Sequence, residues 1–176
     1  MWCVVHVKDG GERHMEDLVA RLLPESLHAR CFHLTRNRRK KYEGQWQTVQ
    51  ENLFPGYVFI DTDQPDRVYK ELKKTPKPKL LFSDEEYVSR LEKHESDLME
   101  RLADRSGRIG ISRVRIGMDG KIHYLSGPLS GMGDMVRRVN LHKRIAEIEA
   151  EILGRKRVLY LGIDIESDER QKDAAS

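Results

Sequence analysis

The residue types and spacings of this chain offer little support for catalytic chemistry. Its seven histidines are scattered, and its acidic residues follow a surface periodicity instead of converging on a serine or a histidine. Cys3 and Cys31 are the only two cysteines, and neither stands in a C-x-x-C pair or in a zinc-type Cys/His spacing. We therefore expect no enzyme activity, no metal ion, no cofactor and no disulfide.

Glycines gather at Gly127-Pro128 and at Gly131-Met132-Gly133. A phosphate-binding loop is one hypothesis for such a segment. However, no Gly-Lys-Ser or Gly-Lys-Thr follows and no helix is expected to open there, so nucleotide binding is not predicted. Sharp turns between strands, which need positive backbone angles, explain these glycines better.

Basic residues carry the clearest chemical signal. The net charge is only +3, from 32 lysines and arginines against 29 acidic residues, so the distribution of charge matters more than its sum. A first group follows residue 35: Arg36, Arg38, Arg39, Lys40 and Lys41. It is either a solubilising loop or a contact with upstream or non-template DNA.

A second group lies near the C-terminus, in predicted turns. Its members are Arg137, Arg138, Asn140, His142, Lys143, Arg144, Arg155, Lys156 and Arg157. They could be solvated residues that balance Glu147, Glu149 and Glu151. Yet the acids share one strand face while the bases lie in turns, and a segregated basic rim is typical of phosphate binding, so we expect RNA to bind here.

Hydrophobic periodicity predicts a mixed N-terminal half. Strands are expected at residues 2–7 and 28–35, and residues 53–60 read as a turn that leads into a buried strand. The basic run 36–41 and Tyr42-Glu43-Gly44 are expected to form a hairpin tip, with Gly44 as the turn residue and a return strand through Trp46. Helical spacing from Met15 to Leu23 and from Val68 to Leu72 predicts two helices. A third is expected to open with a capping box at Ser83 and Glu86 and to run through Val88, Leu91 and Leu102.

The C-terminal half reads as short strands separated by turns, which favours a small all-β barrel. The expected strands are residues 111–118, 121–125, 134–139, 145–153 and 157–165, with turns at Asp119-Gly120 and Gly154-Arg155-Lys156. Residues 145–152 also fit one face of a helix. We expect a strand, because a glycine, a basic turn and another β-branched run follow.

Leu53-Phe54-Pro55-Gly56-Tyr57-Val58-Phe59-Ile60 is the most informative string. Aromatic residues at such spacing usually form core. The string nevertheless resembles the signature strand of the N-terminal domain of the NusG family of transcription elongation factors, and residues 2–5 with Gly11-Glu12 resemble that domain's opening. Residues 126–136, with Lys143-Arg144 and residues 152–155, resemble the family's C-terminal KOW motif.

The resemblance implies an α/β (α+β) N-terminal sandwich, a linker and a C-terminal all-β KOW barrel of the SH3-like kind. The expected ranges are 1–104, 105–111 and 112–166, followed by a polar tail at 167–176. It also implies that the first domain binds the clamp helices of RNA polymerase. Because the first residues do not read as a signal peptide and no run approaches the roughly 20 apolar residues of a membrane helix, we expect a cytoplasmic, monomeric protein without a membrane segment. The implied contact residues are Phe54 and Tyr57. Leu53, Pro55 and Phe59 are weaker candidates, because alternation along the strand should bury some of them.

The KOW segment departs from the general factor. Leu129, Met132 and Leu153 stand where that factor has aromatic residues that contact a ribosomal protein or Rho, so the chain looks like a specialised paralog, most like the LoaP antiterminators. That resemblance implies binding of an RNA hairpin. The alternatives are a general NusG factor with protein partners and a ribosome-associated KOW protein.

Overall fold

The computed structural model describes residues 1–74 and 88–166 of the 176-residue chain. They form two compact units that alternate along the sequence. Unit 1 comprises Met1–Thr35, Asn52–Arg108 and Glu151–Lys156, and unit 2 comprises Arg36–Glu51, Ile109–Ala150 and the residues from Arg157 onward. The division at residues 104 and 112 that the sequence suggested stays a prediction.

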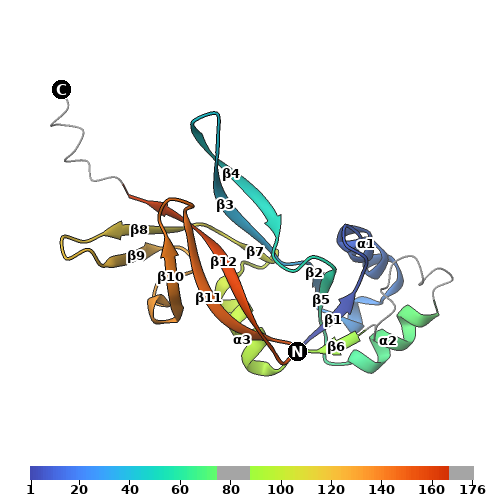
Figure 1. The fold of residues 1–176 in the computed structure, drawn as a ribbon. Coiled ribbons are helices and arrows are strands. Elements are labelled where there is room, and N and C mark those ends of the chain that lie inside the picture. Colours follow the sequence, from blue (N-terminus) through green and yellow to red (C-terminus); the bar gives the residue numbers. More distant parts are fainter. Residues whose placement is uncertain (75–87, 167–176) are drawn as a thin grey trace. The chain divides into compact units, whose positions relative to one another are not determined.

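Unit 1 is built on a four-stranded sheet of order β2-β5-β1-β6 (Figure 1). The strands are β1 (Trp2–His6), β2 (Arg30–Phe32), β5 (Tyr57–Asp61) and β6 (Val88–Arg90). Strand β1 runs antiparallel to β5, with Val4 opposite Phe59 and His6 opposite Tyr57. Trp2 to Val5 are all buried, as expected of a central strand.

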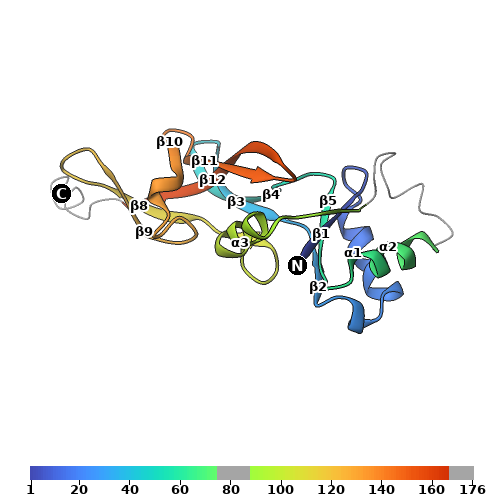
Figure 2. The same ribbon diagram turned by 90° about the horizontal axis from the view of Figure 1, so that it is seen from below.

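Two helices cover one face of this sheet: α1 (Glu12–Leu22) and α2 (Pro65–Lys73). Figure 2 shows both on the same side of β1 and β5. The core between helices and sheet contains Cys3 and Val5 of β1, Val58 and Ile60 of β5, and Met15 of α1. Since side chains alternate along a strand, Trp2, Tyr57 and Phe59 point to the opposite face of the sheet.

Unit 1 also contains the single turn η1 (Glu25–Leu27) and α3 (Lys93–Leu102). Helix α3 opens with a capping box, in which the Glu92 side chain accepts from the N–H of Glu95 and the Glu95 side chain accepts from the N–H of Glu92. The box predicted at Ser83 and Glu86 lies outside the described residues. The helix predicted through Val88 is wrong there, because Val88–Arg90 pair with β1 as an edge strand.

Unit 2 contains a five-stranded sheet of order β10-β11-β12-β8-β9. Its strands are β8 (Ser112–Ile116), β9 (Ile122–Ser126), β10 (Val136–Asn140, after the short turn η3, Gly133–Met135), β11 (Ile145–Ile152) and β12 (Arg155–Ile165). Residues 151–156, at the β11–β12 tip, belong to unit 1. The expected mixed α/β fold with an all-β C-terminal region is confirmed.

The helix-or-strand ambiguity at residues 145–152 is settled as strand. Ile145, Ala146, Ile148, Ala150 and Ile152 of β11 are buried, and the alternating glutamates are not. The turn predicted after it, Gly154-Arg155-Lys156, lies too far toward the C-terminus. The turn residues are Leu153 and Gly154, both with positive φ (54° and 67°), and Arg155 already begins β12.

The remaining strands are β3 (Thr35–Tyr42), β4 (Gln45–Asn52) and β7 (Arg108–Ile109), which form a sheet of order β4-β3-β7. Strand β7 therefore falls within the range 105–111 expected as a linker. The basic run is not part of the hairpin tip, contrary to expectation, whereas the predicted turn at Glu43-Gly44 is confirmed. The run forms β3 itself, and the tip is Glu43-Gly44, whose φ angles of 47° and 81° suit a two-residue hairpin turn.

Candidate functional site

The turn between β4 and β5, residues 53–57, is fixed by three backbone contacts. The Gly56 carbonyl accepts from the N–H of Val7 at 2.8 Å, and the Phe54 carbonyl accepts from the N–H of Tyr57 at 3.2 Å. The N–H of Gly56 donates to Glu12 Oε1 at 2.7 Å. Gly56 has φ of 82°, and a Cβ there would lie 2.9 Å from the Val7 carbonyl oxygen, so glycine is required.

Glu12 of α1 holds this turn in place, and the sequence did not reveal that role. It is buried, at 3% exposure, in the first turn of α1. A carboxylate in such a place stays stable only if it is hydrogen-bonded, and the Gly56 N–H supplies that partner. The resemblance at Gly11-Glu12 marks this position, but an acid directly after Gly10-Gly11 and before an apolar helix face reads equally well as an ordinary first-turn glutamate.

The five candidate docking residues differ in exposure. Leu53, Phe54 and Phe59 are buried at 9%, 4% and 0%. Pro55 is exposed and Tyr57 is half-buried. The burial of Leu53 and Phe59 agrees with the expectation that alternation hides some of the weaker candidates. Phe54 was expected at the contact surface, but its ring packs into the sheet face opposite α1 and α2.

Aromatic rings connect this turn with the core of unit 1. The Phe54 ring lies 6.1 Å from that of Tyr57 and 6.2 Å from that of Phe59, and Phe59 in turn packs against Trp2 at 5.8 Å. The Tyr57 ring also lies 4.8 Å from the imidazole of His6. Tyr57 thus sits at the accessible end of a packed aromatic series.

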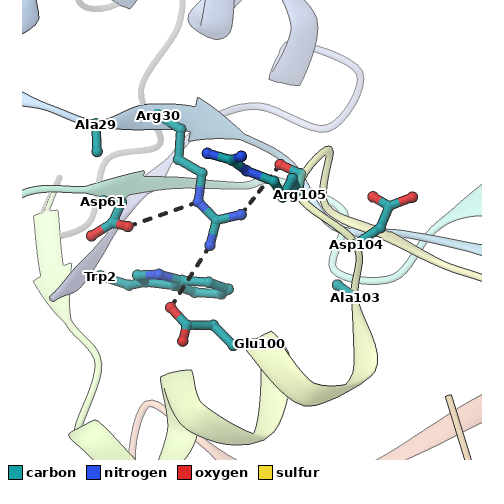
Figure 3. A pocket seen from close by; sticks show the side chains of 8 residues that line it. All are labelled: Trp2, Ala29, Arg30, Asp61, Glu100, Ala103, Asp104 and Arg105. Carbon is teal, nitrogen blue, oxygen red and sulfur yellow. Dashed lines mark hydrogen bonds and ion pairs between the residues drawn. The ribbon is translucent and has the colours of Figure 1, made fainter.

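A pocket of about 490 Å³ lies beside Trp2 in unit 1 (Figure 3). Arg30 occupies its centre, with its guanidinium 5.1 Å from the Trp2 ring centroid and 4.5 Å from that of Phe32. Arg30 also pairs with Asp61 at 3.8 Å and with Glu100 at 3.7 Å, and it donates to the Arg105 carbonyl at 3.2 Å. These contacts satisfy the guanidinium within the protein, so the cluster stabilises unit 1.

The basic hairpin β3–β4 shows two charged faces. Arg36, Arg38 and Lys40 alternate along β3 and share one carboxylate, Glu51 of β4. Burial alone would raise the pKa of Glu51, but the Lys40 hydrogen bond and the charges of Arg38, Lys40 and Arg36 outweigh it and lower that pKa. Three cations on one carboxylate leave this face positive.

Both hairpin faces meet the five-stranded sheet within unit 2. On the first face, Arg36 donates to the Tyr160 carbonyl of β12 at 2.7 Å, and the second face carries Arg39. Arg39 donates to Thr48 Oγ1 at 3.0 Å and to Asp164 Oδ2 of β12 at 3.1 Å. A Cβ on Gly162 would collide with the Asn37 carbonyl oxygen, so the β3 and β12 backbones come close there. The predicted DNA-proximal residues are thus divided between the two faces and are largely engaged in ion pairs.

Trp46 of β4 lies in this second face. The Arg144 guanidinium is 5.0 Å from its ring centroid and Lys41 Nζ is 5.9 Å away. Arg144 also pairs with Asp164 at 3.4 Å. Two guanidiniums, of Arg39 and Arg144, therefore share that carboxylate.

The structure separates the predicted RNA-binding residues. Arg155 and Lys156 belong to unit 1, at the β11–β12 tip, whereas residues 137–144 and Arg157 belong to unit 2. Arg137 is paired with Glu149 at 2.7 Å. Asn140 Oδ1 accepts from the N–H of Lys143 at 2.9 Å and so shapes the turn. Arg138, His142 and Lys143 are exposed.

Residues 1–74 and 88–166 contain no group of three or more histidine, cysteine, aspartate or glutamate side chains placed to hold a metal ion. Within the same residues, no helix has the length and apolar character needed to cross a membrane.

Comparison with known proteins gives the class. Residues 1–102 match the family model described as "NusG: Transcription termination factor nusG", which is more than half of the chain. The chain therefore belongs to the NusG family of transcription factors.

A solved structure entitled "Domain interaction in Thermotoga maritima NusG" is similar to this chain at 17% sequence identity. The alignment covers 92% of each chain with a TM-score of 0.47. A search of curated proteins found no significant match.

Proposed function

We propose that this NusG-family protein is a cytoplasmic elongation and antitermination factor that joins RNA polymerase to a structured leader RNA. The N-terminal part docks on the clamp helices of the polymerase, and the C-terminal β region binds an RNA hairpin. Holding both contacts on one chain raises the effective concentration of the second, so a modest RNA affinity is enough for selectivity.

For polymerase docking, the support is a rigid turn that exposes an aromatic edge. Tyr57 and Pro55 are the accessible members of the candidate set, and Phe54 and Phe59 pack beneath them. Glu12 and Val7 hold the turn through Gly56. A preorganised apolar ridge of this kind suits a helix tip, because little entropy is lost on binding.

The observation that carries the RNA proposal is the division of charge around residues 137–144. Two of the acidic groups there are engaged: Glu149 pairs with Arg137, and Asp164 pairs with Arg144. The cations of Lys143 and Arg138 are exposed, although Glu147 lies opposite Arg138 in the register. Exposed cations on a turn that is itself hydrogen-bonded suit phosphates and base edges.

The structure also bears on the runner-up, a general factor with a protein partner. Of the three side chains that replace the expected partner-contacting aromatics, Leu129 and Met132 are buried at 0% and 4%, and Leu153 is half-buried. A loop whose apolar side chains point into its own core offers a partner protein no anchor. The burial of these two side chains favours RNA as the ligand of the C-terminal region.

Roles within the RNA site follow from the contacts. Lys143 is suited to a phosphate, since an ammonium acts as a point charge. Arg138 is suited to a base edge, because its guanidinium is exposed and carries no ion pair among the described residues. Arg144, which the sequence suggested as a base reader, is held by Asp164 and Trp46 and instead shapes the surface.

The test selects hairpins from a random-loop RNA library with the full-length chain and then titrates the selected hairpin and a scrambled version at several salt concentrations. We expect tighter binding of the selected hairpin. Lys143→Gln should weaken binding of both RNAs alike and lower the salt slope by about 1. Arg138→Gln should instead reduce the preference between them.

Lys121→Gln serves as the matched control, because Lys121 is an exposed lysine of the β8–β9 turn and lies away from residues 137–144 in the sheet order. Equal affinities for selected and scrambled RNA, or failure to bind either at low salt, would reject RNA as the ligand. The general-factor function would then be favoured.

A further inference from the structure

Trp46 stands out because the roles described so far do not require it. It is a half-buried indole on β4, and the chain has two tryptophans in all. The other, Trp2, is in the core of unit 1 at 2% exposure. A large ring left partly exposed on a basic hairpin is the kind of side chain on which an unpaired base stacks.

The neighbourhood of Trp46 is cationic. Lys41 and Arg144 lie within cation–π distance of its ring, and Asp164 is shared between Arg39 and Arg144. Near them, His142 and Lys143 are exposed on the turn that ends at Arg144. Permanent cations thus outnumber this carboxylate around the ring, which suits a polyanion.

The Arg144 side of the surface is preorganised. Arg144 adopts φ of 54°, its carbonyl accepts from the N–H of Ile163 at 3.0 Å, and its N–H donates to the Leu141 carbonyl at 3.4 Å. The Asn140 side chain closes the same turn on Lys143. Lys41, by contrast, is exposed at the hairpin end and can move aside for a ligand.

We propose that Trp46 and Arg144 form a stacking platform for an unpaired base of the bound RNA, with Lys41 and Lys143 contacting the flanking phosphates. This inference rests on the proposed RNA-binding function and extends its site from the C-terminal sheet to the β3–β4 hairpin. The loop of the RNA hairpin supplies the base, and its stem contacts the cations of residues 138–143.

The experiment uses the full-length chain and three synthetic stem-loops with one stem sequence: an RNA with an all-adenosine loop, the same RNA with abasic loop positions, and a DNA of the first sequence. Tryptophan emission and affinity are measured together. Trp46→Phe supplies the baseline emission of buried Trp2, and Tyr42→Ala is the matched control, because Tyr42 is an exposed aromatic of the same hairpin (48% exposed).

We expect the adenosine-loop RNA to quench the emission of Trp46 and the abasic-loop RNA to leave it nearly unchanged. Trp46→Leu should weaken binding of the adenosine-loop RNA by roughly five- to a hundredfold, the range of one base–aromatic stack. The same substitution should leave the abasic-loop RNA unaffected, and Trp46→Phe and Tyr42→Ala should bind nearly as the unmodified chain does.

The outcomes separate this inference from the function on which it rests. If no stem-loop binds at low salt, both fail. If the two RNAs bind equally and without quenching, the platform is disproved and the RNA-binding function stands. Equal quenching by the DNA stem-loop would overturn the assignment to RNA. If Trp46→Leu does not fold, the comparison of adenosine and abasic loops on the unmodified chain decides.

Discussion

The carboxylate of Glu12 and the backbone N–H of Gly56 are joined by a hydrogen bond of 2.7 Å across 44 residues of sequence. The contact ties the start of α1 to the turn that precedes β5. It links a buried carboxyl group to the turn that we propose for polymerase docking.

Replacing Glu12 should therefore loosen that turn. Glu12→Ala leaves the Gly56 N–H without its partner, and we expect a loss of about 1–3 kcal/mol in the free energy of unfolding. Glu12→Gln keeps an acceptor and should cost less. Urea unfolding measures both, with Asp17→Ala, an exposed carboxylate on the same helix, as control. Equal stability of all three variants would contradict a structural role for the hydrogen bond.

Two glycines with nearly the same φ test the close approach at this turn. A Cβ added at Gly44 (φ 81°) would have nothing within 4 Å, whereas one added at Gly56 (φ 82°) would meet the Val7 carbonyl oxygen at 2.9 Å. Gly44→Ala should cost about 1–2 kcal/mol, the strain of the left-handed region alone. Gly56→Ala should cost clearly more. Thermal unfolding compares them, and a larger effect at Gly44 would contradict the crowding at Gly56.

Substitutions of Phe54 and of Tyr57 should have different effects, the first on stability and the second on polymerase docking. Phe54→Ala empties a buried site and should cost about 3–5 kcal/mol in stability. Tyr57→Ala should leave the protein folded but reduce its copurification with RNA polymerase, because an accessible aromatic anchor is commonly worth about 2 kcal/mol or more. A folded Tyr57→Ala chain that copurifies fully with polymerase would remove Tyr57 from the docking surface.

Glu51 should make the stability of the protein depend on pH. Its folded-state pKa is lowered, so its contribution to stability is present above the unfolded-state value of about 4.3 and is lost as the pH falls through the depressed folded value. Denaturant unfolding of the wild type and of Glu51→Gln should therefore differ most near neutral pH and converge in acid. A constant difference across that range would show that the charge of Glu51 does not matter.

Gly162 tests the packing of β3 on β12. Gly162→Ala pushes a methyl group against the Asn37 carbonyl oxygen and the Arg38 Cα, so the two strands must separate. Gly110→Ala is the control, because nothing lies within 4 Å of its added carbon. We expect Gly162→Ala alone to lower the thermal midpoint. Indistinguishable midpoints for the two variants would argue against the close approach.

Sequence periodicity predicted the regular elements well and the contacts between them poorly. The alternation of residues 145–152 was enough to place β11, since one buried face recurs every second residue. The run Arg36 to Lys41 was expected at a hairpin tip because of its charge. It forms a strand instead, and its cations are partly neutralised by Glu51 of the neighbouring strand and by Asp164, which is 125 residues from Arg39. A local sequence pattern cannot predict ion pairs between residues so far apart in the chain.

The same limit applies to the candidate site. The string from Leu53 to Ile60 marked the right turn, but exposure is decided by how its rings pack on Trp2 and Phe32, which are distant in sequence. Val88–Arg90 became a strand because β1 offered a free edge. A three-residue segment has too little periodicity to show this in advance.

The ion pair of Arg39 with Asp164 can form only late during translation of the described residues. Its two residues are 125 positions apart, and Arg36 reaches the Tyr160 carbonyl across 124. At about 5–20 residues per second, the hairpin strand leaves the ribosome roughly 6–25 s before the strand that it packs against. During that interval the basic hairpin is translated but lacks its contacts with β12, so unit 2 is completed only after Asp164 has been made.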